Sequence, residues 1–249
     1  MGWYPMLVEL AGRPVVVIGG GRVAERKVAA LLEAEARVRV VSPSLTPALR
    51  RWAEEGRVEA VLREAEAADL DGAYLAFVAG GDDEFRARMI AAAKARGVPV
   101  NAAGDGEKGD FLTPAVVRRG DLVLAVSVSG ASPALAARIA AELKERYGSE
   151  YERLSKALRA VRRTVKARVP DPVERRRLLA AAASEAGAAV LLAEEALPEG
   201  DELVALLRTL SVSTAVNERE PEDGPRQKPE PGNSPRREPE PGVSPQQEP

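Results

Sequence analysis

Short β-rich runs alternate with helical stretches along the first hundred residues. The β-rich runs cover residues 14–18, 37–41, 57–62, 74–78 and 98–101, and helical spacing follows three of them, at 22–32, 46–55 and 82–96. Strands that alternate with helices in this way lie parallel, because each crossover helix returns the chain to the same edge of the sheet. The uninterrupted apolar run at 14–18 fits burial on both faces. The pattern predicts a doubly wound parallel α/β sheet.

The pattern changes after residue 110. Residues 111–119 and 121–128 resemble two strands separated by Gly120, which predicts an antiparallel pair. Residues 132–147 follow at helical spacing, and Ser132 is suited to cap that helix at its amino end. We therefore expect a strand pair followed by one helix.

Helical spacing fills residues 149–210, and a polar tail follows. Breaks are expected at three places: residues 170–172, Gly187 and residues 198–200. The stretch RAVRRTVKARV at 159–169 has a valine every four positions, which favours an amphipathic helix with a charged outer face over a nucleic-acid-binding stripe. From about residue 217 a tail follows, and its imperfect repeat at 228–247 is rich in Pro, Gly, Glu and Ser. The tail has little to bury, so its composition predicts disorder.

Composition removes several classes of site. The 249 residues include neither Cys nor His, which excludes disulfides and metal sites built on thiolate or imidazole. The formal charge of −2 gives no global excess that would favour nucleic acid or a membrane surface. No apolar run approaches a membrane span of about 20 residues, and no basic leader precedes an apolar stretch at the start. We expect a cytoplasmic protein without a metal, nucleic-acid or membrane partner.

A glycine motif lies between the first strand and the first helix. In PVVVIGGGRVAERK (14–27), Gly19, Gly21 and Ala24 match G-x-G-x-x-G/A. Gly19 allows a tight turn, Gly21 lets the backbone approach a pyrophosphate, and Ala24 lets helix and strand pack closely. The helix amides face the anion. Because a strand precedes the motif and a helix follows it, the motif is typical of a Rossmann dinucleotide site.

We expect the dinucleotide to contact three segments of this domain. The candidate contacts are Gly19, Gly21, Arg22, Val23 and Ala24 in the motif, Ser42 and Pro43 after the second strand, and Val78, Ala79 and Gly80 after the fourth. A carboxylate usually follows the second strand and binds the ribose hydroxyls. Ser42 stands there instead and can donate to a hydroxyl or to a phosphate. The residues alone leave NAD and NADP open.

Four segments in order carry a resemblance to a known family: GGGRVAERK, VNAAGD, DFLTPAVVRRG and SVSGASPALA. Together they resemble the precorrin-2 dehydrogenase and sirohydrochlorin ferrochelatase family, which includes the N-terminal module of bacterial siroheme synthases. The resemblance covers residues 5–150 and, more loosely, extends to about 210. It implies NAD as oxidant, precorrin-2 as substrate, sirohydrochlorin as product, and a homodimer.

The resemblance also implies a division of the chain into an NAD-binding Rossmann domain at 1–112, a dimerisation segment at 113–147 and a helical domain at 148–213. The composition of the tail adds a fourth, disordered part at 214–249. In this reading the helical domain closes over the substrate.

Two departures from the family pattern bear on iron insertion. Bifunctional members read N-V-V-D after the fifth strand, whereas Gly104 takes the fourth position here and Asp105 follows it. A serine of the S-S-G-G-T-S-P type motif is replaced by Val128. Both departures weigh against iron insertion more than against dehydrogenation. Asp105 is the candidate catalytic residue, to accept the proton released on oxidation; the alternative is an aspartate that stabilises a glycine-rich turn.

The substrate is a polycarboxylate, so cationic and hydroxyl side chains are candidate contacts. The candidates are Asn101, Lys108, Arg118, Arg119, Ser127 and Ser129. For each cation the alternative is a solvated surface charge. For the whole chain the alternative is a Rossmann module that senses NAD and regulates a partner without catalysis.

Overall fold

The computed structural model describes residues 2–104, 108–193 and 197–217, with side chains up to residue 212. The chain divides into two compact units, residues 1–159 and 160–249. The predicted tail lies almost wholly outside the described residues. The four-part division expected from the sequence stays a prediction.

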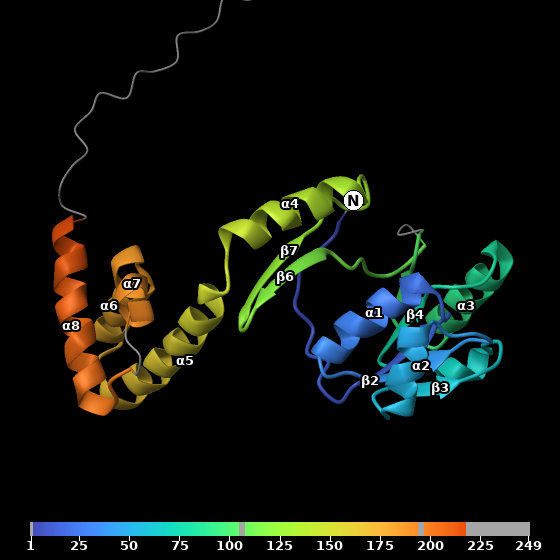
Figure 1. Cartoon of the computed structure of the whole chain (residues 1–249), viewed down its shortest axis with the longest axis horizontal. Coiled ribbons are helices and arrows are strands. Elements are labelled where there is room, and N and C mark those ends of the chain that lie inside the picture. Colours follow the sequence, from blue (N-terminus) through green and yellow to red (C-terminus); the bar gives the residue numbers. More distant parts are fainter. Residues whose placement is uncertain (1, 105–107, 194–196, 218–249) are drawn as a thin grey trace, which may run out of the picture. The chain divides into compact units, whose positions relative to one another are not determined.

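The first unit contains a sheet of five parallel strands in the order β3-β2-β1-β4-β5. The strands are β1 (Pro14–Ile18), β2 (Arg37–Val41), β3 (Glu59–Val61), β4 (Leu75–Val78) and β5 (Val100–Ala102). The connections are α1 (Arg22–Glu33), α2 (Pro47–Glu54), the 3₁₀ turn η1 (Ala67–Leu70) and α3 (Asp83–Ala95). Figure 1 shows this sheet with its helices α1, α2 and α3. The predicted doubly wound Rossmann sheet is confirmed.

Alternation along β1 explains the two cores of this sheet. Val15 and Val17 pack with Val28 of α1, whereas Val16 and Ile18 pack on the opposite face in the cluster that contains Ile90 of α3. Successive side chains of a strand point to opposite faces, so an uninterrupted apolar strand needs helices on both sides. Burial of this strand fixes the edge from which the loop to α1 emerges.

After the sheet, the chain forms a two-stranded antiparallel hairpin and a helix. The strands are β6 (Ala115–Arg119) and β7 (Leu122–Val126), with Gly120 in the turn at φ +57°. Helix α4 (Pro133–Arg146) packs against both strands. The Ser132 side chain accepts a hydrogen bond from Leu135 N, as expected of an N-cap. The predicted strand pair and capped helix are confirmed.

The remaining helices are α5 (Glu150–Arg168), α6 (Pro172–Ala183), α7 (Glu185–Ala193) and α8 (Gly200–Asn217). Val161, Val165 and Val169 are all buried, which confirms the amphipathic interpretation of this stretch. The predicted break at Gly187 is wrong, because the break falls at Ser184. Ser184 Oγ donates to Ala181 O and accepts from Gly187 N, so it ends α6 and starts α7.

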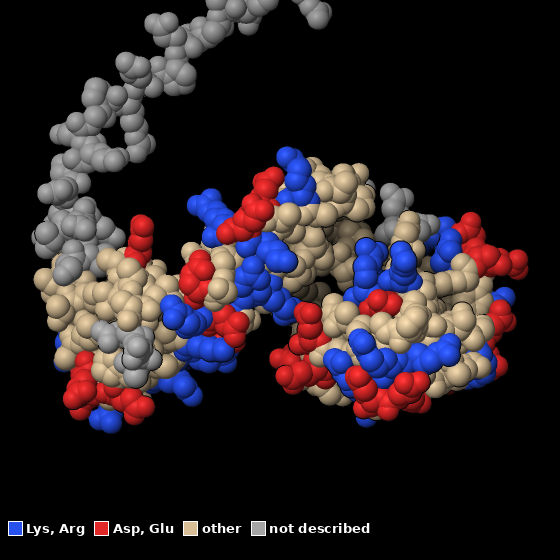
Figure 2. Space-filling view, viewed as in Figure 1, with Lys and Arg blue, Asp and Glu red and all other residues tan. Residues whose placement is uncertain are grey.

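Charged side chains are mixed over the surface. Figure 2 shows Lys and Arg interspersed with Asp and Glu over the Rossmann sheet and its helices, without a continuous stretch of one sign in this view. Among the described residues, no helix is long and apolar enough to cross a membrane.

Candidate dinucleotide and substrate site

The loop between β1 and α1 is built from three glycines, and the first packs against the end of β4. Gly19 has φ +121°, and a Cβ there would lie 2.8 Å from Ala79 O and from Gly80 N. Ala79 N donates to Ile18 O at 2.8 Å, which joins the same two strand ends. Only glycine fits this close approach, and the approach brings the expected nicotinamide-side residues to the loop.

The second glycine packs against the segment after β2. A Cβ on Gly20 would overlap Ser44 O, and Thr46 N donates to Gly20 O at 2.9 Å. Sequence reasoning missed Gly20 because the motif leaves its position unspecified. The run of three glycines was the available signal. Gly20 therefore joins the Gly19–Gly21 loop, which we call the cradle, to the amino end of α2.

The third glycine faces open space. Nothing lies within 4 Å of a Cβ built on Gly21, which is the N-cap of α1 and has no side-chain cap. The first backbone amides of a helix have no partner within it. Ala24 is fully buried one turn later, which holds helix and strand close together. Open space beside unpaired amides fits a pyrophosphate, so the residues present suit a bound dinucleotide.

The expected ribose contacts differ in accessibility. Ser42 is buried, and its N donates to Val61 O at 3.0 Å. Its Oγ would lie 2.9 Å from a Cβ on Gly20, so the hydroxyl packs against the cradle. Pro43 is exposed. At the other end of the site, the Val78 side chain lies in the core, whereas Ala79 and Gly80 are partly exposed beside Gly19. A ligand at the nicotinamide side therefore meets small residues and backbone.

The open edge of β5 is covered by the chain as it returns toward the hairpin. Asp110 N donates to Val100 O at 2.8 Å, and Val100 N donates to Asp110 Oδ2 at 3.0 Å. A Cβ on Gly109 would lie 2.9 Å from Val100 O. Asn101 is 4% exposed, and its Nδ2 donates to Phe111 O at 2.9 Å. Sequence reasoning missed Gly109 and Asp110, since nothing local indicates that they pair with β5.

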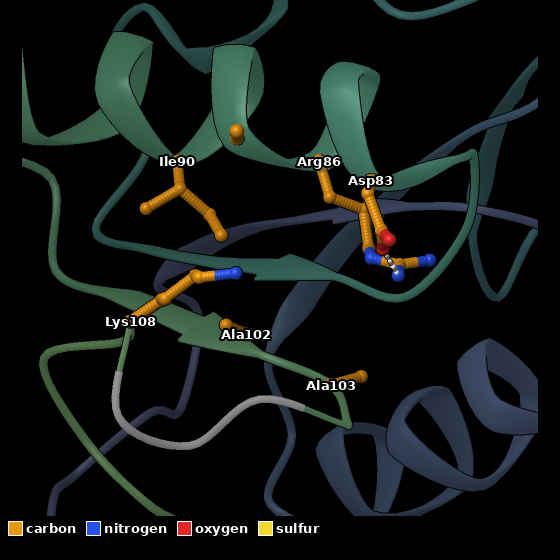
Figure 3. Close-up of a pocket in the computed structure, with 7 residues that line it drawn as sticks. Asp83, Arg86, Ile90, Ala102, Ala103 and Lys108 are labelled. Carbon is orange, nitrogen blue, oxygen red and sulfur yellow. Dashed lines mark hydrogen bonds and ion pairs between the residues drawn. The ribbon is translucent and has the colours of Figure 1, made fainter.

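The loop that leaves β5 contains the candidate catalytic residue. Gly104 has φ +87°, a left-handed conformation that suits glycine. Asp105 lies outside the described residues. The next described residue, Lys108, lines a hollow under α3 (Figure 3), together with Asp83, Arg86, Ala87, Ile90, Ala102 and Ala103. Arg86 is ion-paired with Asp83 and donates to Gly81 O at 2.7 Å.

The candidates on the hairpin separate into fixed and exposed side chains. Arg119 donates to Tyr147 O at 3.0 Å and to Lys144 O at 3.1 Å, so it caps the carboxyl end of α4. Arg118 is exposed, with its Nε 3.8 Å from Glu33 Oε2 on α1. Ser127 and Ser129 are also exposed, and the Ser129 amide donates to Ser127 Oγ at 3.2 Å.

Comparison with known proteins decides the family. Residues 6–115 match a family model described as putative NAD(P)-binding. Siroheme synthases of Chromobacterium violaceum and Gluconacetobacter diazotrophicus are 38% and 36% identical over 177 and 181 residues, 71% of this chain in each case. The chain belongs to the precorrin-2 dehydrogenase and siroheme synthase family. It spans 38% of the length of either siroheme synthase.

A solved member of the family has the same fold. The structure of "SirC, precorrin-2 dehydrogenase" superposes with a TM-score of 0.64 at 25% identity, covering 83% of this chain and all of that one. The predicted cofactor class, a nicotinamide dinucleotide, is confirmed by the family. Among the described residues, no group of three or more acidic side chains is arranged to hold a metal ion.

Proposed function

We propose that this protein oxidises precorrin-2 to sirohydrochlorin with NAD in siroheme biosynthesis. The observation that carries the proposal is the cradle at Gly19–Gly21, open at Gly21, in a chain of this family. The siroheme synthases are similar to this chain in sequence, and the precorrin-2 dehydrogenase is similar to it in fold. The siroheme synthases are longer, and their other activities are no part of the proposal.

The cofactor, when bound, supplies the acceptor for the hydride that leaves the macrocycle. The chain's own residues bind and orient it. Gly21 and the first amides of α1 hold the diphosphate, while Ala79 and Gly80 leave room for a flat ring at the ends of β1 and β4. We assign the accompanying proton to Asp105, on the ground that it follows β5 at the carboxyl edge of the sheet.

The polycarboxylate substrate needs cationic partners at the same edge. Lys108 lies beside β5, and Arg118 is exposed on the hairpin. We propose both as substrate contacts, with Asn101, Ser127 and Ser129 as polar neighbours. Arg119 already donates to the carbonyls at the end of α4, so we assign it to positioning that helix.

An anaerobic assay with purified protein, precorrin-2 and NAD tests the proposal. Sirohydrochlorin absorbance is expected to rise only when NAD is present. Asp105→Asn is expected to lower kcat by about 10²–10⁴-fold, as for loss of a general base, whereas the control Glu84→Gln on the exposed start of α3 leaves kcat unchanged. NAD binding without turnover would support the sensing module instead. Ferrous ion added after oxidation tests whether the protein also inserts iron.

We also propose a homodimer, and exposed apolar side chains in the first unit support it. Tyr4, Met6 and Leu7 are 83%, 72% and 81% exposed, and Val116 lies exposed on the hairpin. A two-stranded sheet is marginally stable alone in water. Helix α4 packs against β6 and β7, and a second copy would cover the apolar groups that remain exposed.

A further inference from the structure

Lys27 is a charged residue of α1 that is not among the expected cofactor contacts. It lies on α1, six residues after the N-cap Gly21, and its side chain is half-buried. The ammonium lies 5.7 Å from the centroid of the Phe77 ring and donates a hydrogen bond to Thr113 Oγ1. Within the described part of the chain, no carboxylate pairs with Lys27.

A half-buried ammonium without a counter-charge is a costly arrangement. Removal from water disfavours the charged form unless an anion or hydrogen-bonding groups replace the water. Burial, and then the nearby charge of Arg26, lowers the pKa of Lys27 below its ordinary value. A ring face and one hydroxyl compensate only part of the lost hydration. The site therefore favours the arrival of an anion.

The surroundings of Lys27 are fixed by other contacts. Phe77 and Phe111 pack edge to face with ring centroids 5.4 Å apart. The backbone of Phe111 is held by Asn101, whose Oδ1 is buried without a hydrogen-bond partner among the described residues. These contacts form an apolar floor beneath the ammonium, while Thr113 is exposed and leaves the pair open to solvent.

Lys27 and Thr113 can serve one carboxylate together. A lysine ammonium has three donors, of which one reaches Thr113. Since the Thr113 oxygen accepts that bond, its own proton remains available for a second acceptor. Two adjacent donors, one of them charged, match the two oxygens of a carboxylate.

The pair lies at the edge of the sheet where ligands of this fold bind. Phe77 directly precedes Val78, the last residue of β4, and Ala79 then packs against Gly19 of the cradle. In doubly wound sheets, ligands occupy the crevice outside the carboxyl ends of the strands. A flat substrate placed against the nicotinamide side would bring its peripheral acid groups within reach of α1.

We propose that Lys27 and Thr113 form a binding subsite for one carboxylate of the tetrapyrrole. This subsite rests on the proposed function and adds a substrate contact from α1 that the glycine motif does not indicate. It predicts that the charge of Lys27 contributes to tetrapyrrole affinity and not to NAD affinity.

Titration of the full-length protein with sirohydrochlorin, followed by absorbance under anaerobic conditions, tests this subsite. Lys27→Met keeps the apolar length of the side chain and removes its charge; sirohydrochlorin affinity is expected to fall about 10-fold, as for loss of a charged hydrogen bond. Lys27→Arg restores most of that affinity. NAD affinity, measured by calorimetry, stays unchanged in both variants. Lys156→Met is the matched control, because Lys156 is an exposed lysine on α5.

The outcomes separate the two proposals. If the unsubstituted protein binds sirohydrochlorin and Lys27→Met binds it equally well, the subsite is wrong and the oxidation proposal stands. If Lys27→Met loses NAD and sirohydrochlorin affinity together, Lys27 supports the fold only, and the subsite is again overturned. If the unsubstituted protein binds no sirohydrochlorin and shows no NAD-dependent turnover, both proposals fail.

Discussion

The three glycines between β1 and α1 meet three different neighbours. Gly19 packs on Ala79, Gly20 packs on Ser44, and Gly21 faces open space. A motif assigns its positions by spacing, but the neighbours determine what a side chain at each position would do. Gly20 supports the fold of the loop, whereas Gly21 leaves room for a ligand.

Substitution by alanine separates these two roles. Gly21 has φ −86° and free space around its Cβ position, so Gly21→Ala is expected to keep the melting temperature of the unsubstituted protein. Its NAD affinity is expected to fall at least 10-fold, because the added Cβ occupies the path of the pyrophosphate. Gly20→Ala is expected to lose about 1–3 kcal/mol of stability through overlap with Ser44 O. Thermal melts and NAD calorimetry measure both. Equal stability of the two variants would contradict this assignment.

Asp69 in η1 predicts a pH dependence of stability. Arg63 binds both of its oxygens at 2.7 Å, and Glu66 N donates to it at 2.8 Å. The hydrogen bonds from Arg63, and then that from Glu66 N, hold the pKa of Asp69 below its ordinary value. A lowered pKa stabilises the fold above the unfolded-state pKa, and this contribution is lost as pH falls through the folded-state pKa.

Asp69→Asn is therefore expected to lose about 1 kcal/mol at pH 7, a modest loss because Arg63 is partly exposed. The difference from the unsubstituted protein should shrink as pH falls below about 4, the ordinary pKa of an aspartate in the unfolded chain, toward the lower pKa that Asp69 has in the folded protein. Urea unfolding at several pH values measures it. Asp71→Asn removes a more exposed partner of Arg96 and is the control. A difference that persists unchanged at low pH would count against the charge of Asp69.

Elements of this chain begin and end where side chains satisfy free backbone groups. Asp82 and Ser132 cap α3 and α4, and the cap at Ser132 was predicted from the sequence. The boundary between α6 and α7 is different, because it depends on Ser184 and not on the glycine three residues later. Gly187 lies buried inside α7, where a Cβ would overlap Ala181 O.

Gly187→Ala tests this close contact between helices. Alanine normally favours a helix by up to about 1 kcal/mol over glycine. Here we expect a loss of about 1–3 kcal/mol, since overlap with the last carbonyls of α6 outweighs the propensity. Denaturant unfolding measures the loss, with Ala189→Gly at an exposed position of α7 as the propensity control. A gain in stability would show that α7 moves freely away from α6.

At the scale of the whole molecule, exposed apolar groups require an explanation. Met6 and Leu7 lie near the amino end, and Val116 lies on the hairpin, all within the first unit. If a second copy covers them, light scattering after size exclusion should give the mass of two chains. Val116→Glu is then expected to shift the protein toward one chain, whereas Val173→Glu, exposed on α6, should not. A single-chain mass for the unsubstituted protein would overturn the homodimer.

The local residue pattern was sufficient to predict much of the fold of this protein. Strands such as β1 and the amphipathic stretch around Val161 and Val165 follow from periodicity, because burial of one face or of both leaves a direct mark on residue order. The cradle at Gly19 and Gly21 follows from a motif whose geometry is local. Four short segments in order were also sufficient to indicate the family.

Only the tertiary structure decided which residues meet across long stretches of chain. The pairing of Asp110 with β5, the contact of Lys27 with Thr113 and the close packing of Gly187 join positions whose residue types carry no periodic signal. Arg118 and Arg119 are the same residue type, yet Arg119 caps α4 and Arg118 is exposed. A side chain's role depends on which partners the fold brings to it, and neighbours in space are not encoded by neighbours in sequence.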